Sequence, residues 1–320
     1  MSINNRWKKV ERHKGVYLPT IRENKFIDKN SKVCLMGSCF ADEMGWVLQE
    51  NGINIGEVEK NIEMRHVVYP WGTFFTPLNL LNILEVTFNE NSVKNIFDQK
   101  SFIKVPKNLI GNHYEASTQY SVQDEFNYWC LFLKARLQTA DIEFAKKKID
   151  EKLKKFRISL INADVVVITL GLIETWIDND KKKAWHSFQG DAIKHKSIDN
   201  LAYFKLLTYE DILECIDKII KIIFNLGSKK IIFTVSPIPL NFTFTDNDIV
   251  VANKYSKSIL RASVEKFIDN KNIFYFPSFE IVQDCVGWPL AYKQDKRHVR
   301  VEVFKEYISP IFIKSFTNLN

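Results

Sequence analysis

The segment KVCLMGSCFADEMGWVLQENG, residues 32–52, decides the fold of this chain. Residues 32–36 form a short apolar run of the kind that makes a buried parallel strand. Gly37 then permits a tight turn, and a helical pattern covers residues 41–50 and ends before Gly52. A strand, a tight turn and a helix in this order are typical of an α/β protein.

The same pattern recurs along the chain. Apolar runs at 164–170, 230–235 and 273–276 are each followed by a turn residue, and helical patterns cover 77–88, 124–139, 208–226, 250–268 and 301–313. Strands that alternate with helices predict a doubly wound, mostly parallel sheet with helices on both faces. The functional loops of such a sheet lie at the carboxyl ends of its strands.

The length and composition fit one folded domain. The chain has 320 residues, 46% of them hydrophobic and 26% charged, which excludes a disordered protein. Since no repeat or Pro/Gly linker divides it, we expect a single domain over residues 1–320. Residues 89–158 break the alternation of strands and helices, and we interpret them as a helical insertion.

Several classes of protein are not expected. The chain lacks an apolar run long enough to span a membrane, and its polar, basic N-terminus lacks the core of a secretory signal, so we expect a cytoplasmic protein. The net charge of +7 includes lysine runs at 146–148 and 181–183, which usually form solvated faces. We therefore expect no nucleic-acid partner and no membrane span.

Metal and nucleotide sites are not expected either. The five cysteines are scattered without a CxxC pair and are interpreted as reduced thiols. His66, His113, His186 and His195 have no metal-ligand spacing with nearby cysteines or carboxylates, although His66 lies close enough to Gly72 to support a site there. Neither GxGxxG nor a P-loop motif is present, so no cofactor is expected.

Ser38 is the first candidate for chemistry. A serine between a strand and a helix presents its hydroxyl at the edge of the sheet, where the N–H groups and positive dipole end of the helix can stabilise an oxyanion. Serine is also a favoured helix N-cap, so the position alone leaves a structural role open. Cys39 is an alternative nucleophile, because a helix N-terminus lowers a thiol pKa, but only one of two adjacent side chains can face the site.

The second candidate lies near the C-terminus, at Asp295 and His298. A serine hydroxyl needs an imidazole as general base, and the imidazole needs a carboxylate that fixes its tautomer and stabilises its charge. Three-residue spacing within a turn places both groups on one side. An exposed histidine without function is the alternative for this pattern taken alone.

Taken together, these segments resemble the GSCFA family, which is named after the pentapeptide found here at residues 37–41. The resemblance extends through most of the chain and includes YPWGTFFTP (69–77), VITLGLIETW (167–176), TVSPIPL (234–240), ANKYSKSILR (252–261), YFPSFEI (275–281) and DKRH (295–298). The family is identified as part of the SGNH or GDSL hydrolase superfamily. This resemblance implies a three-layer, flavodoxin-like sandwich.

The resemblance also implies roles for individual residues. Ser38 is the expected nucleophile, Asp295 and His298 complete the triad, and the backbone N–H groups of Ser38 and Gly72 form the oxyanion hole. The superfamily's third block, GxND, supplies an asparagine to that hole, but here the matching strand end has Gly171 and Glu174 without the asparagine. Losing one such donor typically costs about 10²- to 10³-fold in rate, so a different group replaces it or the catalysis differs.

A second departure is that Val299 and Arg300 stand where a proline or serine often follows the DxxH, and we attach little weight to it. Glu174 and Asn253 are candidates to replace the missing donor. Trp71, Trp176 and Trp288 lie in or beside the expected site loops, where an aromatic face can hold a sugar ring, although core packing is the alternative for each. The candidate substrate-binding residues are Trp71, Gly171, Glu174, Trp176 and Asn253.

The resulting hypothesis is a metal-independent esterase or O-acyltransferase that forms an acyl-enzyme on Ser38. The family resemblance suggests an ester on a glycan or glycan precursor, and a transferase would take acetyl-CoA or another acyl donor. The alternative is a catalytically weak scaffold that binds a glycan or a partner protein. The substrate, the acyl group and the oligomeric state stay open.

Overall fold

The computed structural model describes residues 11–62, 66–88, 97–106, 126–133, 136–137, 141–186, 200–268 and 270–319. A four-stranded parallel sheet with the order β13-β12-β9-β3 forms its centre. The strands are β3 (Val33–Gly37), β9 (Val165–Leu170), β12 (Lys230–Val235) and β13 (Ile273–Tyr275). Every residue of β3 and β9 is buried, which explains their continuous apolar sequences. All four strands expected from the sequence are confirmed.

The sheet has a topological switch point beside β3. On its outer edge, Lys32 forms a parallel bridge with Asn54, and the Val33 N–H donates to the Asn54 carbonyl at 2.8 Å. On its inner edge, β3 pairs with β9. The chain therefore leaves β3 toward one side and later returns on the other, so the carboxyl ends of β3 and β9 flank the position where open α/β sheets bind ligands.

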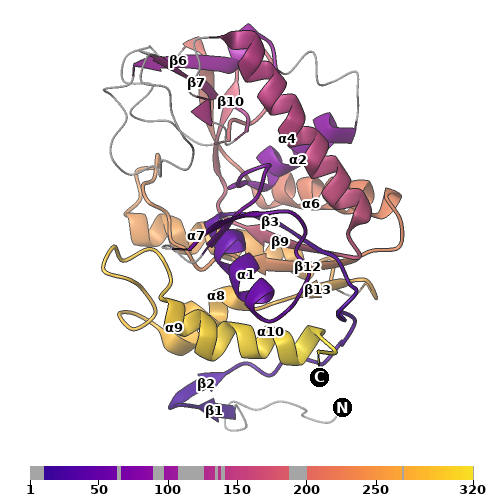
Figure 1. The fold of residues 1–320 in the computed structure, drawn as a ribbon. Coiled ribbons are helices and arrows are strands. Elements are labelled where there is room, and N and C mark those ends of the chain that lie inside the picture. The colour runs from indigo at the N-terminus through magenta and orange to yellow at the C-terminus, as the bar shows by residue number, and fades with distance from the viewer. Residues whose placement is uncertain are drawn as a thin grey trace.

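Helices cover both faces of the sheet (Figure 1). One layer holds α1 (Cys39–Glu50) and α10 (Ser309–Phe316), which α9 (Val301–Val303) and the π-helical turn η6 (Phe304–Ile308) precede. The other holds α2 (Pro77–Phe88), α4 (Ile142–Asn162) and α6 (Tyr209–Asn225), with α7 (Ile249–Glu265) beside α6. The architecture is the expected three-layer α/β sandwich.

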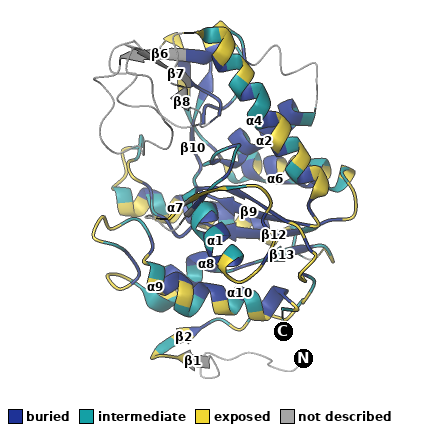
Figure 2. Ribbon diagram, in the orientation of Figure 1, coloured by how far each residue is buried: buried dark blue, intermediate teal, exposed yellow. Residues whose placement is uncertain are grey.

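Helix α6 illustrates how the sequence sets these elements. Thr208 accepts a hydrogen bond from the Asp211 N–H, and Asp211 accepts one from the Thr208 N–H, which makes a capping box. Its buried face carries isoleucines at helical spacing: Ile212, Ile216, Ile219, Ile220 and Ile223. Figure 2 shows the same division in the other helices, with buried residues toward the sheet and exposed residues outward.

The insertion differs from the expectation. It contains the helix α4, which continues past residue 158, but it also contains an antiparallel sheet of β6 (Phe102–Pro106), β7 (Phe126–Cys130) and β8 (Arg136–Leu137). The helix expected over 124–139 is therefore wrong at 126–130, where the sequence FNYWC forms a strand. Aromatic residues favour a paired strand, and β6 supplies the partner.

Other elements were not anticipated. β10 (Glu174–Asp178) pairs antiparallel with β11 (Ala202–Leu206). Two short hairpins join β1 (Glu11–His13) to β2 (Val16–Leu18) and β4 (Glu59–Asn61) to β5 (His66–Val68). A short helix, α8 (Ser278–Glu280), leads into the π-helix η5 (Ile281–Val286). Among the residues placed by the structure, no helix has the length and apolarity needed to cross a membrane.

Candidate functional site

Ser38 lies at the switch point, directly after β3. Gly37 makes the turn possible: it has φ +131°, and a Cβ added there would lie 2.1 Å from the Thr169 carbonyl oxygen. Ser38 itself occupies the N-cap position of α1, yet its side chain accepts no hydrogen bond from the helix. The hydroxyl is buried and has no hydrogen-bond partner. Capping therefore does not account for a serine at this position.

Asp295 and His298 form a complete pair within one turn. The Asp295 Oδ2 lies 2.6 Å from the His298 Nδ1, and its Oδ1 accepts the backbone N–H groups of Arg297 at 2.9 Å and His298 at 3.0 Å. Burial alone would raise the pKa of Asp295, but the hydrogen bonds from His298 and from these N–H groups lower it below its ordinary value. The carboxylate thus stays ionised and fixes the imidazole, which leaves Nε2 for chemistry.

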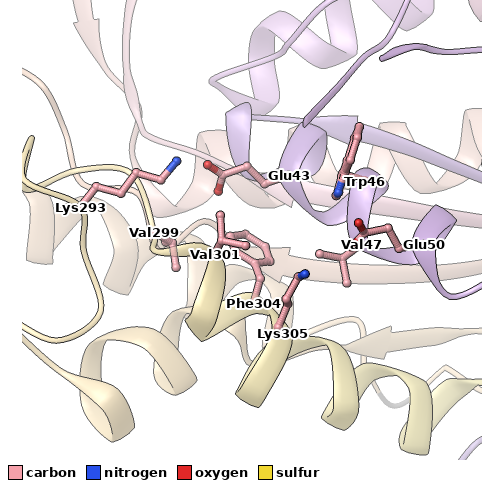
Figure 3. Close-up of a pocket in the computed structure, with 9 residues that line it drawn as sticks. All are labelled: Glu43, Trp46, Val47, Glu50, Lys293, Val299, Val301, Phe304 and Lys305. Atoms are coloured by element: carbon pink, nitrogen blue, oxygen red, sulfur yellow. The ribbon is translucent and has the colours of Figure 1, made fainter. Parts of the chain in front are cut away.

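Helix α1, which follows Ser38, packs against η6, which follows the Asp295 turn in the chain. The rings of Phe40 and Phe304 stack with centroids 5.0 Å apart. A small hollow separates α1 from the 293–305 segment, and Figure 3 shows the side chains that line it. No hydrogen bond joins Ser38 to His298. The structure thus places the two candidate segments on adjoining elements, without a hydrogen bond between Ser38 and His298.

Glu43 lies in this hollow and was not anticipated. Its carboxyl points toward the ammonium group of Lys293 across the hollow, but the two do not form an ion pair (Figure 3). Burial raises the pKa of Glu43 to about 8, although the charge of Lys293 opposes the shift. The side chain is therefore largely protonated at neutral pH, next to the Asp295 turn.

The second loop of the site covers residues 69–76. The Phe74 N–H donates to the Gly37 carbonyl at 2.6 Å, which seats the loop beside Ser38. Gly72 has φ +77°, and its N–H donates to the Tyr69 carbonyl at 2.9 Å, so this donor is used within the turn. The Ser38 N–H similarly donates to the Thr169 carbonyl at 3.3 Å. Both expected oxyanion donors therefore have protein acceptors in this structure.

The comparison with protein families covers all of these segments. The GSCFA family model matches residues 32–312, from the start of β3 to α10, and so includes the Ser38 corner and the Asp295 turn. The chain belongs to the GSCFA family. Comparison of the sequence with curated proteins and with solved structures gives no match.

In this GSCFA protein the loop after β9 is tightly packed. A Cβ at Gly171 would lie 2.6 Å from the Phe75 carbonyl oxygen, so only glycine allows this approach. Glu174 accepts hydrogen bonds from the Thr243 hydroxyl at 2.7 Å and the Phe244 N–H at 2.8 Å. The Asn253 Oδ1 accepts the Leu240 N–H at 3.1 Å. Glu174 and Asn253 thus hold neighbouring loops in place.

The tryptophans differ in exposure. Trp71 is 1% exposed, with its ring centroid 5.1 Å from that of Tyr69 and 5.0 Å from that of Phe156, so no face of it is open to a sugar. Trp176 is partly buried against Phe244. Trp288 is 49% exposed and stacks on Tyr292 with centroids 4.0 Å apart. Of the three, Trp288 presents the most open ring.

The structure places only some of the other histidines. His186 is buried, with its Nε2 3.3 Å from the Thr73 hydroxyl. His113, His195 and the side chain of His66 lie outside the described residues. All five cysteines are free thiols, and Cys39 is partly buried. Within the part of the chain that the structure describes, no cluster of His, Cys, Asp and Glu could hold a metal ion.

Lys257, like Glu43, was not anticipated from the sequence. Lys257, on α7, is 1% exposed and donates from Nζ to the carbonyls of Gly171 at 2.5 Å and Ile238 at 2.9 Å. It therefore joins the loops after β9 and β12. Its position on the buried face of α7, with Ser256, Leu260 and Val264, could have indicated an unusual lysine from helical spacing alone.

Proposed function

We propose that this GSCFA protein is an SGNH-type serine esterase or O-acyltransferase that acts on an oxygen ester of a glycan or glycan precursor. Two features of the same protein carry the proposal. Asp295 and His298 form a complete dyad, and the buried Ser38 hydroxyl has no hydrogen-bond partner. An unpaired buried hydroxyl costs about 1–3 kcal/mol, which fits a group kept for chemistry. We also propose that the protein is located in the cytoplasm.

The proposed reaction begins with attack of the Ser38 Oγ on the acyl carbonyl carbon. The His298 Nε2 takes the hydroxyl proton and then gives it to the departing alcohol oxygen, which leaves an acyl group on Ser38. Water or a sugar hydroxyl attacks this ester while His298 again takes the proton, and Ser38 is restored. Asp295 holds the imidazole orientation throughout, since it already binds Nδ1.

The oxyanion needs donors aimed at the developing charge. The N–H groups of Ser38 and Gly72 donate to the carbonyls of Thr169 and Tyr69. Small movements of the two loops would therefore be required before these N–H groups could bind an oxyanion. The helix α1 also begins at this corner: its Ala41 N–H donates to the Ser38 carbonyl at 2.8 Å, and the positive end of the helix dipole lies next to Ser38. We therefore assign the start of α1 as the main oxyanion stabiliser, with the positive end of the helix dipole adding to it.

The chemistry uses the serine, histidine and aspartate side chains and requires no metal or resident cofactor. A transferase would bind acetyl-CoA or another acyl donor as a substrate. Of the three candidate tryptophans, Trp288 is the most exposed, so its ring is the one available to contact a sugar.

A screen with short acyl esters and with acetyl-CoA plus acceptor sugars tests the proposal. We expect hydrolysis or transfer by the wild-type protein and loss of at least about 10³-fold in Ser38→Ala. Ser236→Ala is the matched control, because Ser236 is another buried serine at the end of a central strand. Equal activity in Ser38→Ala and the wild type would refute the proposed nucleophile.

A second candidate function is a glycan- or partner-binding protein on the same scaffold. The observation that favours it is that Ser38 does not contact His298 and that the two expected backbone donors are already used. This candidate predicts that a folded wild-type protein shows no turnover of any ester while it binds an oligosaccharide with unchanged affinity in Ser38→Ala. The enzyme proposal predicts turnover.

A further inference from the structure

Glu43 lies between the helix that follows Ser38 and the loop that carries His298. It is on α1, five residues after Ser38, and its Oε2 is buried without a hydrogen-bond partner. Its carboxyl points across the hollow toward the ammonium of Lys293 (Figure 3). Burying a carboxyl oxygen that lacks a partner destabilises a protein, so packing does not explain a glutamate at this position.

The hollow is too small to be a substrate site. Its volume is about 10 Å³, which is room for at most one water molecule. Besides Glu43 and Lys293, it is lined by Trp46, Val47, Val299, Val301 and Phe304, with the charged Glu50 from α1 and Lys305 from η6. A role for Glu43 in catalysis would therefore act through the protein and not by contact with the substrate.

Lys293 connects this hollow to the loop of residues 292–299, which we call the dyad loop. An antiparallel bridge between Tyr292 and Val299 closes the loop, and the Lys293 N–H donates to the His298 carbonyl at 2.8 Å. The same loop carries Asp295, whose Oδ2 lies 2.6 Å from the His298 Nδ1. A displacement of Lys293 is therefore transmitted to the backbone of His298.

We propose that Glu43 and Lys293 are positioning residues for His298. In the active form the Glu43 carboxyl accepts a hydrogen bond from the Lys293 ammonium, and this contact fixes the dyad loop relative to Ser38, at the start of the same helix as Glu43. In the structure the two groups face each other without this bond, and Ser38 also has none to His298. The inference rests on the proposed function, because a nucleophile needs its base at a fixed place.

The protonation state of Glu43 follows from burial and from the charges around it. Burial raises its pKa to about 8, and the charges of Asp42 and Asp295 add to the rise while that of Lys293 opposes it. Near neutral pH the carboxyl is largely neutral, and its carbonyl oxygen can still accept a hydrogen bond from an ammonium. Glutamine offers the same acceptor, whereas leucine offers none.

Steady-state kinetics with an acyl ester test the positioning role. Glu43→Leu should lower kcat about tenfold or more and change KM by less than about twofold, since the substrate does not reach the hollow. Its midpoint of urea unfolding should equal or exceed that of the wild type, because a buried oxygen without a partner is removed. Glu43→Gln should restore most of the rate at pH 7. Glu50→Leu, the same change at the exposed end of α1, is the control and should keep the wild-type kcat.

The partner lysine gives a second test. Lys293→Met should lower kcat as Glu43→Leu does, and the double variant should be no slower than either single variant, because both changes break one contact. Losses that multiply in the double variant would contradict a shared contact.

An NMR titration of the His298 ring separates this inference from the proposed catalysis, since it needs no substrate. In the wild type the ring signals should show a second step near pH 8, from Glu43, that is absent in Glu43→Gln and persists in Ser38→Ala. In Lys293→Met the step should move to higher pH, because the opposing positive charge is gone.

A folded Glu43→Leu with the wild-type kcat, or His298 signals that titrate identically in the wild type and Glu43→Gln, would overturn the proposal. A second step in a protein that turns over no ester would support the link between Glu43 and the dyad loop and contradict the proposed function instead.

Discussion

Two central strands, β3 and β12, end at the same edge of the sheet with a buried serine. Each serine donates its backbone N–H to β9, Ser38 to Thr169 at 3.3 Å and Ser236 to Leu170 at 2.8 Å. They differ in the hydroxyl, because the Ser236 Oγ accepts the Ile238 N–H at 3.3 Å whereas the Ser38 Oγ has no partner. At equivalent backbone positions, one serine hydroxyl is thus held by a hydrogen bond and the other has none.

The largest expected effect concerns the base that Ser38 would use. Asp295→Asn keeps the turn but replaces the acceptor that fixes His298, so kcat/KM for an ester should fall by about 10⁴-fold. The equivalent change at Asp284, an exposed aspartate paired with Lys254, should alter the rate by less than about twofold. Comparable rates for Asp295→Asn and the wild type would contradict the role of the dyad.

The geometry of the β3 turn gives the next largest effect. Gly37→Ala forces a Cβ to within 2.1 Å of the Thr169 carbonyl, so we expect a loss of about 4 kcal/mol or more in unfolding free energy. Gly52→Ala is matched in that φ is also positive, at +78°, but its Cβ would meet nothing within 4 Å. It should cost only about 1–2 kcal/mol in urea denaturation. Equal losses of unfolding free energy in the two variants would contradict the predicted clash between a Cβ at residue 37 and the Thr169 carbonyl.

The β12 loop depends on Lys257, whose pKa burial lowers to about 7. Between about pH 7 and 10.5 the unfolded chain keeps a proton that the folded lysine has lost, so stability should rise with pH at up to about 1.4 kcal/mol per pH unit. Lys257→Met should lack this rise, so the difference in unfolding free energy between the wild type and the variant should change with pH over that range. A pH-independent difference over that range would contradict a buried, titrating lysine.

The smallest expected effect concerns Glu43. Its contribution to the free energy of unfolding should change with pH in the opposite direction to that of Lys257. Its pKa is raised to about 8, so the folded chain keeps a proton that the unfolded chain has lost, and its contribution to stability should fall between about pH 4.5 and 8. Glu43→Gln should therefore be more stable than the wild type above pH 8 by on the order of 1 kcal/mol. Glu50→Gln, on the exposed end of α1, should show no such gain.

The central sheet could be predicted from the sequence because its strands are buried on both faces. Continuous apolar runs followed by turn residues located β3, β9, β12 and β13 within one or two residues. Helices with one strongly periodic apolar face, such as α6, could also be predicted. The strand β7 was missed because it is defined by its partner β6, more than twenty residues earlier, and no local pattern shows that pairing.

The site was predictable only in part. Ser38, Asp295 and His298 stand in motifs, and the structure places all three on adjoining elements. The hydrogen bonds that hold Glu174 and Asn253 in loops could not be inferred from spacing, since their partners lie more than ten residues away. Glu43 and Lys257 have charged side chains that usually face solvent, and only the packed structure shows that Lys257 is buried and that the Glu43 Oε2 is covered.

Covalent labelling of the intact protein with a fluorophosphonate, followed by mass spectrometry of its peptides, tests directly whether the unpaired hydroxyl at the end of β3 is a nucleophile. We expect one adduct, on the peptide that contains Ser38, and its loss in His298→Gln. A folded protein that forms no adduct, or that is modified at Ser236 instead, would contradict it.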